Sequence, residues 1–128
     1  MGNIKIGRIS CDFDDTIVIR GQGLDIKSIV PHCKEALYLL RKKGYEIIVS
    51  SCRTNTVFGG KDGKGHKDMV EFLKKQNIPY DHVDEGDQGK VVCSFYCDDR
   101  GVGAPLTKEG YFDWKKAYLL ITKDNLKE

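Results

Sequence analysis

Short apolar runs alternate along the chain with apolar residues at helical spacing. The runs in residues 4–13, 45–50, 80–83 and 91–97 predict strands. The run Ile47–Val49 is continuous rather than alternating, which is typical of a strand covered on both faces. Because helical segments separate these strands, the pattern predicts right-handed β-α-β crossovers and a parallel sheet with helices on both faces.

Three segments carry the helical pattern, and one carries a hairpin signal. Apolar residues recur at intervals of three and four in residues 31–44 and 66–76, and again after Asp113, which suits an N-cap. Each pattern predicts an amphipathic helix. The apolar triplet 17–19 precedes a glycine-rich turn at 20–23, which predicts a small hairpin or flap.

Length and composition narrow the class of protein. The chain has 128 residues, 40% apolar and 31% charged, without repeats or linkers, so we expect one globular domain over residues 1–128. The net charge of +2 does not predict binding to nucleic acid or to a membrane, and no apolar run approaches the ~18 residues that span a bilayer. The five cysteines have no disulfide-scaffold or zinc-knuckle spacing, and no secretory signal is present. We therefore expect free thiols in a reducing, cytoplasmic compartment.

The densest polar feature directly follows the first predicted strand. Residues 12–15 hold three carboxylates, and like charges this close are unfavourable unless a positive group lies among them. Alternate side chains of a strand share a face, so Asp12 and Asp14 should point one way and Phe13 toward the core. Mg²⁺ prefers carboxylate oxygens, so the segment predicts a magnesium site, with a solvated acidic turn as the alternative.

Polar side chains also follow two later strands. Ser51 and Arg53 come after the second, and Asp98 and Asp99 after the fourth, with Lys90 shortly before it. In open parallel sheets, ligands bind beyond the carboxyl ends of the strands, so these groups should meet at one edge. Carboxylates from two strands could hold one Mg²⁺, while a hydroxyl and a lysine could hold phosphate oxygens. This combination suits phosphoryl transfer, in which catalysis is mostly positioning and charge neutralisation.

These residues resemble the haloacid dehalogenase (HAD) superfamily of phosphohydrolases. Asp12–Thr16 matches its D-x-D-x-T signature, and Ser51 stands where the family has a hydroxyl after the second strand. Lys90 stands where it has a phosphate-neutralising lysine, and Asp98-Asp99 matches its acidic fourth motif. The motifs occur in the family's order over almost the whole chain. The D-D-R ending at Arg100 resembles small members without a cap domain.

The resemblance implies a three-layer, Rossmann-like, HAD-like fold without a cap, and a Mg²⁺-dependent phosphomonoesterase acting through an aspartyl-phosphate. It implies Asp12 as the nucleophile and Asp14 as the general acid/base. We expect the substrate to be a small-molecule phosphate ester or the phosphorylated end of a macromolecule, and we leave a homo-oligomer open. The predicted phosphate and substrate ligands are Thr16, Ser51, Arg53 and Lys90, and the predicted metal ligands are Asp12, Asp14 through its carbonyl, Asp98 and Asp99.

Two of these assignments stay open. Lys67 also lies between the second and fourth motifs, so Lys90 is preferred only for its place before the fourth strand. Asp99 is preferred over Asp98 as the direct metal ligand, with the reverse as the alternative.

The same sequence features bear on two alternative functions, a binding module and a receiver domain. A catalytically silent binding module that uses the basic loop 59–67 is the alternative to an enzyme. A receiver domain is not expected, because Thr54–Thr56 occupies the place where it needs its phospho-acceptor aspartate. His66 and His82 are expected at the surface rather than as ligands.

Overall fold

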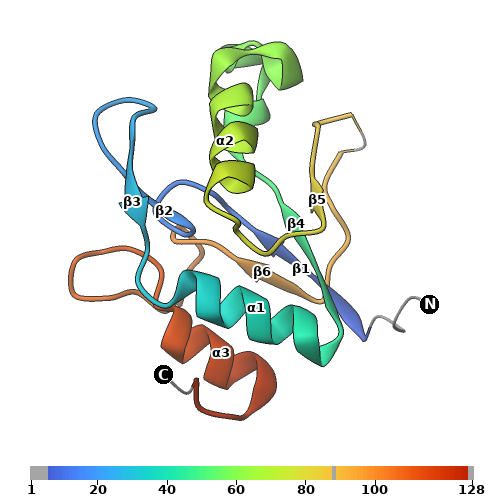
Figure 1. The fold of residues 1–128 in the computed structure, drawn as a ribbon, viewed down its shortest axis with the longest axis vertical. Coiled ribbons are helices and arrows are strands. Elements are labelled where there is room, and N and C mark those ends of the chain that lie inside the picture. Colours follow the sequence, from blue (N-terminus) through green and yellow to red (C-terminus); the bar gives the residue numbers. More distant parts are fainter. Residues whose placement is uncertain (1–5, 88, 127–128) are drawn as a thin grey trace.

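The computed structural model describes residues 6–87 and 89–126. Its centre is a four-stranded parallel sheet of order β5-β4-β1-β6 (Figure 1). The strands are β1 (Gly7–Cys11), β4 (Tyr45–Val49), β5 (His82–Val83) and β6 (Phe95–Cys97). The predicted α/β class with a parallel sheet is confirmed, and β1, which leads into the acidic segment, is an interior strand.

The predicted helices and hairpin are also present. The helices are α1 (Cys33–Lys43), α2 (Lys64–Lys75) and α3 (Trp114–Thr122). The hairpin pairs β2 (Val18–Arg20) antiparallel with β3 (Ile26–Ile29), and we call residues 18–29 the flap.

Three short 3-10 turns give the basic loop an ordered path from β4 to α2. They are η1 (Cys52–Thr54), η2 (Thr56–Phe58) and η3 (Gly60–Asp62). The last turn leads directly into α2, which therefore begins two residues before the predicted start at residue 66.

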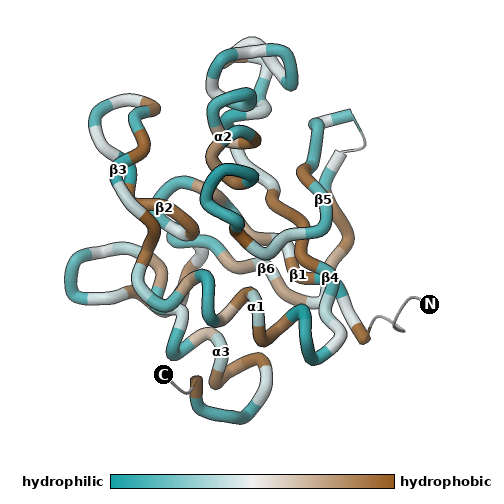
Figure 2. Tube along the Cα trace, viewed as in Figure 1, coloured by the Kyte–Doolittle hydropathy of each residue, from teal (hydrophilic) through white to brown (hydrophobic). Residues whose placement is uncertain are grey.

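All three helices pack into one apolar core. Leu37 of α1, Leu73 of α2 and Trp114 of α3 belong to the same buried cluster as Ile9 of β1. In Figure 1, α1 and α3 lie side by side in front of the sheet. Figure 2 shows hydrophobic residues concentrated in the central strands and hydrophilic residues at the loop tips, as the sequence pattern predicted.

On the opposite face of the sheet, the described residues form no helical layer of the kind that we expected. Residues there alternate with the core residues and include Arg8, Ile48 and His82; Ile48 is 4% exposed yet lies outside the main core cluster. The crossover from β5 to β6 contains no helix in its described residues, 84–87 and 89–94. Its composition is acidic and glycine-rich before Lys90, so it has no apolar stripe from which to build one.

The structure also bears on membrane association. Among the residues described, no helix has both the length and the apolar character needed to cross a bilayer.

Candidate active site

The four parallel strands end level with one another. The register pairs Val83 with Val49, Val49 with Cys11, and Cys11 with Cys97. The residues that come next along each strand are polar: Asp84, Ser50, Asp12 and Asp98. The register therefore brings the acidic segment, the segment after β4 and the D-D-R segment to one edge of the sheet.

Asp12 and Asp99 are neighbours at this edge. The Asp12 N–H donates to the carbonyl oxygen of Cys97 at 2.9 Å, which ties the two acidic segments together. The Asp12 and Asp99 side chains are close enough for their charges to interact. The pKa of Asp12 is raised to about 7, chiefly by burial and also by the nearby charges of Asp99 and Asp14, while a hydrogen bond from the Phe13 backbone lowers it in part.

Asp99 carries a buried oxygen that nothing in the described chain satisfies. Its Oδ1 is shielded from solvent and has no hydrogen-bond partner. Leaving such an acceptor unpaired is costly, and it lies beside a second carboxylate. A divalent cation shared by Asp12 and Asp99 would satisfy both groups, so the donor set fits Mg²⁺.

Asp98 differs from Asp99 in that its carboxylate accepts hydrogen bonds from the backbone. Its Oδ1 accepts hydrogen bonds from the N–H groups of Arg100, at 3.0 Å, and Gly101, at 2.6 Å. These bonds cap the turn that follows β6. Asp98 therefore holds the loop, whereas Asp99 keeps an oxygen without a partner among the described residues, and the prediction of Asp99 as the direct metal ligand with Asp98 supporting it stays a prediction.

Arg53 does not contact solvent in this structure, and its predicted contact with substrate stays a prediction. Its side chain is 0% exposed. Its Nε donates to Asp14 Oδ2 at 2.8 Å and its Nη2 donates to Asp14 Oδ1 at 2.7 Å. The guanidinium also lies over the Phe13 ring, 5.1 Å from the ring centroid.

The Asp14 carboxylate is consequently turned toward Arg53, which leaves its carbonyl as the group that could face a metal. Among the described residues, no three His, Cys, Asp or Glu side chains gather as a metal site. Mg²⁺ does not need such a cluster, because it usually keeps several waters and binds protein through one or two carboxylates. The Asp12–Asp99 pair meets that smaller requirement.

The two predicted hydroxyl ligands differ in their surroundings. Thr16 is fully buried, and its carbonyl accepts a 2.7 Å hydrogen bond from Trp114 Nε1, while its predicted contact with substrate stays a prediction. Ser51 is partly exposed and its Oγ accepts from the Arg53 N–H at 3.1 Å, which caps η1. Its hydroxyl hydrogen stays free to donate, so its role as a phosphate ligand stays a prediction.

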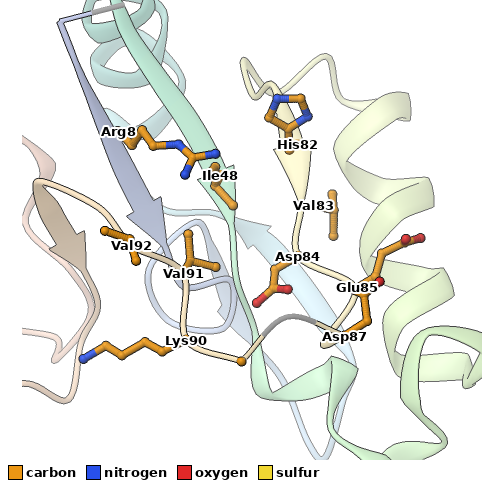
Figure 3. Close-up of a pocket in the computed structure, with 11 residues that line it drawn as sticks. Arg8, Ile48, His82, Val83, Asp84, Glu85, Asp87, Lys90, Val91 and Val92 are labelled. Atoms are coloured by element: carbon orange, nitrogen blue, oxygen red, sulfur yellow. The ribbon is translucent and has the colours of Figure 1, made fainter.

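In the described structure, neither candidate lysine forms an ion pair with Asp12 or Asp99. Lys90 is exposed, and its Nζ lies 4.8 Å from the centroid of the Tyr96 ring. Figure 3 shows its side chain pointing away from Asp84 and Glu85. Lys67 is exposed in the first turn of α2. The choice between the two lysines as phosphate ligand stays open.

A network of hydrogen-bonded polar side chains lies beside Ser51 and was not predicted from the sequence. Asp84 accepts a 3.1 Å hydrogen bond from Ser50 Oγ, and Thr54 Oγ1 lies 2.7 Å from Nδ1 of His66. His66 is only 5% exposed, so its predicted surface position is wrong, because the first turn of α2 packs it inward. The position of Asp84 directly after β5 was the available signal, since Asp12 follows β1 in the same way.

A cavity of about 470 Å³ lies on the sheet face that no helix of the described chain covers (Figure 3). Its lining includes Arg8, Ile48 and His82, and His82 is exposed, as predicted. Asp12 and Asp99 do not line it, so this cavity is not part of the candidate active site.

The raised pKa of Asp12 predicts a pH-dependent stability in metal-free protein. The folded state binds the Asp12 proton more tightly than the unfolded chain, in which the pKa is near 3.8. Protonated Asp12 therefore adds stability that is fully present below about pH 4 and is lost as the pH rises through 7. Urea unfolding in EDTA between pH 4 and 8 should show this loss in wild type and a shallower one in Asp12→Asn. Equal slopes in the two proteins would contradict it.

Comparison of the sequence with protein-family models and with curated proteins finds no match. Among solved structures, the chain is similar to a conserved protein encoded by a locus of Bacteroides thetaiotaomicron, with a TM-score of 0.69 and 26% identity. The similarity covers 94% of this chain and 92% of the other, which supports the α/β fold over nearly its whole length. That protein's name states no activity, so function rests on the residues of the present chain.

Proposed function

We propose that the protein is a Mg²⁺-dependent phosphohydrolase that cleaves phosphate monoesters through an aspartyl-phosphate on Asp12. The observation that carries the proposal is the contact between Asp12 and Asp99, together with the unpartnered, buried Oδ1 of Asp99. Such a pair is unfavourable by itself and suits a site built around a cation. The shared strand edge and the order of the motifs support the same assignment.

The metal would be held by the carboxylates of Asp12 and Asp99 and by the Asp14 carbonyl. When bound, Mg²⁺ would neutralise these carboxylates and the phosphoryl oxygens. The Asp12 carboxylate attacks phosphorus and the ester oxygen leaves with its electron pair, and Asp14, which carries a proton at this step, gives that proton to the leaving oxygen. Water then attacks the aspartyl-phosphate, Asp14 takes the proton, and phosphate is released with Asp12 regenerated.

The surroundings of the site suit an accessible substrate. The described segments that follow β1 and β4 are the flap and three 3-10 turns. We propose a small-molecule phosphate ester or a phosphorylated macromolecular end as the substrate. Cys11, Cys33, Cys52, Cys93 and Cys97 are all unpaired, which supports a reducing, cytoplasmic setting.

The direct test is hydrolysis of p-nitrophenyl phosphate, followed by a panel of phosphometabolites and 3′-phosphorylated oligonucleotides. We expect turnover with Mg²⁺ and a loss of about 10²-fold or more in EDTA, because the acidic pair then lacks its cation. Restoring Mg²⁺ should restore activity. A wild-type protein inert across the whole panel would contradict the proposal and favour the silent binding module.

A further inference from the structure

Arg53 joins three separate segments beneath the candidate site. Besides its two bonds to Asp14, its Nη2 donates to the Leu24 carbonyl at 2.7 Å and its Nη1 to the Gly65 carbonyl at the longer distance of 3.5 Å. Leu24 lies at the tip of the flap and Gly65 in the first turn of α2. One guanidinium therefore connects the proposed acid/base, the flap and α2.

The guanidinium has little freedom to take another position. It is fully buried, it lies against the Phe13 ring, and its own backbone N–H is held by Ser51. A planar guanidinium that gives two parallel bonds to a carboxylate fixes the plane of that carboxylate as well as its distance. The direction of the Asp14 side chain is thus set by Arg53.

The flap tip reaches Arg53 because α2 carries a glycine at the contact. A Cβ added at Gly65 would lie 3.0 Å from Leu24 Cδ1 and 3.6 Å from Arg53 Cβ. The first distance is tighter than an ordinary contact, so a methyl group here would push the Leu24 side chain by a few tenths of an ångström, and a larger side chain would need the space that Leu24 occupies. Figure 1 shows the flap and α2 next to each other above the sheet.

We propose that Arg53 is a positioning residue that makes the placement of the Asp14 carboxylate depend on docking of the flap tip against α2. The inference rests on the proposed function, in which Asp14 transfers the proton. When the tip leaves α2, Arg53 loses the Leu24 carbonyl, and its buried donors must find new partners. Arg53 and Asp14 then move together, so the site is complete only with the flap docked.

The test compares Arg53→Lys in the wild-type and Asp14→Asn backgrounds, with p-nitrophenyl phosphate and saturating Mg²⁺. Lysine keeps the charge but loses the two-bond geometry, so we expect kcat to fall about 10²-fold while KM changes less than about threefold. In Asp14→Asn the same substitution should lower kcat by no more than about twofold, because its effect acts through Asp14.

Arg41→Lys is the matched control. Arg41 Nη2 bonds Asp81 Oδ1 at 3.0 Å, so it is also an arginine–aspartate pair, but one away from the acidic edge. Its kcat should stay at the wild-type value in both backgrounds. Thermal unfolding of each variant verifies that it is folded.

Two results, each obtained with an active wild-type protein, would overturn this inference and leave the proposed function intact. An equal fall of kcat in both backgrounds would mean that Arg53 only supports the fold. A rise confined to KM would mean that Arg53 binds substrate. An inert wild type would overturn the proposed function and, with it, this inference.

If Arg53→Lys does not fold, Gly65→Leu takes its place. It leaves Arg53 and Asp14 intact and favours the helix, while its side chain needs the space that Leu24 occupies at the flap tip. We expect a lower kcat in the wild-type background and no further fall in Asp14→Asn. An unchanged kcat in the wild-type background would overturn the inference.

Discussion

Asp12→Asn is expected to abolish Mg²⁺-dependent hydrolysis of p-nitrophenyl phosphate, with kcat falling on the order of 10⁴-fold or more. An amide cannot replace the carboxylate as the nucleophile that forms the covalent intermediate. The substitution keeps the size of the side chain and removes the repulsion with Asp99. The variant should therefore stay folded in EDTA while it loses turnover, which steady-state kinetics and thermal unfolding measure together.

Asp15→Asn is the matched control for this experiment. Asp15 belongs to the same acidic segment, but its Oδ1 accepts from the Arg20 N–H at 3.2 Å and its φ is 60°, a conformation that asparagine tolerates. We expect kcat to stay within about threefold of wild type, because asparagine keeps an oxygen acceptor for that bond. Equal losses in the two variants would mean that the segment acts through its overall charge, and full activity in Asp12→Asn would remove Asp12 as the nucleophile.

Asp99→Asn should remove most of the affinity for Mg²⁺ and also stabilise the metal-free protein. Half of the proposed carboxylate ligands is lost, so the Mg²⁺ concentration for half-maximal activity should rise by about 10²-fold. Without metal, the buried and unpartnered Oδ1 no longer carries charge beside Asp12, so the melting temperature in EDTA should increase. The Mg²⁺ dependence of turnover measures the first effect, and thermal unfolding in EDTA measures the second.

Asp98→Asn serves as the comparison. Its amide oxygen can still accept from the N–H groups of Arg100 and Gly101, so the turn should hold. We expect the Mg²⁺ dependence to change by less than about threefold, since Asp98 is not the direct ligand. If the two variants exchanged their behaviour, Asp98 would be the ligand and the assignment from the hydrogen bonds would be reversed.

Several parts of the site followed from the order of residues. Each parallel strand is an apolar run that ends at a polar residue, and parallel strands place their carboxyl ends together. Asp12 after β1 and Asp98 after β6 were therefore predictable as neighbours at one edge. The flap was predictable for a similarly local reason, because an apolar triplet followed by glycines favours a hairpin.

Other parts needed contacts between distant segments. The choice between Asp98 and Asp99 depended on which carboxylate capped the turn after β6. The partner of Arg53 depended on how the flap docked on α2, and no local pattern encodes that contact. The prediction of helices on the second face was wrong for the described residues 84–87 and 89–94, because a crossover between parallel strands need not contain a helix.

By itself, the sequence determined the parallel α/β class, the flap and the edge where the acidic residues gather, since these depend on periodicity and strand order. Only the tertiary structure decided that, among the described residues, Asp99 keeps an oxygen without a partner, Arg53 is buried on Asp14, and one face of the sheet carries no helix. The physical reason is that burial and hydrogen-bond partners are set by segments far apart in the chain, whereas periodicity is set by neighbours.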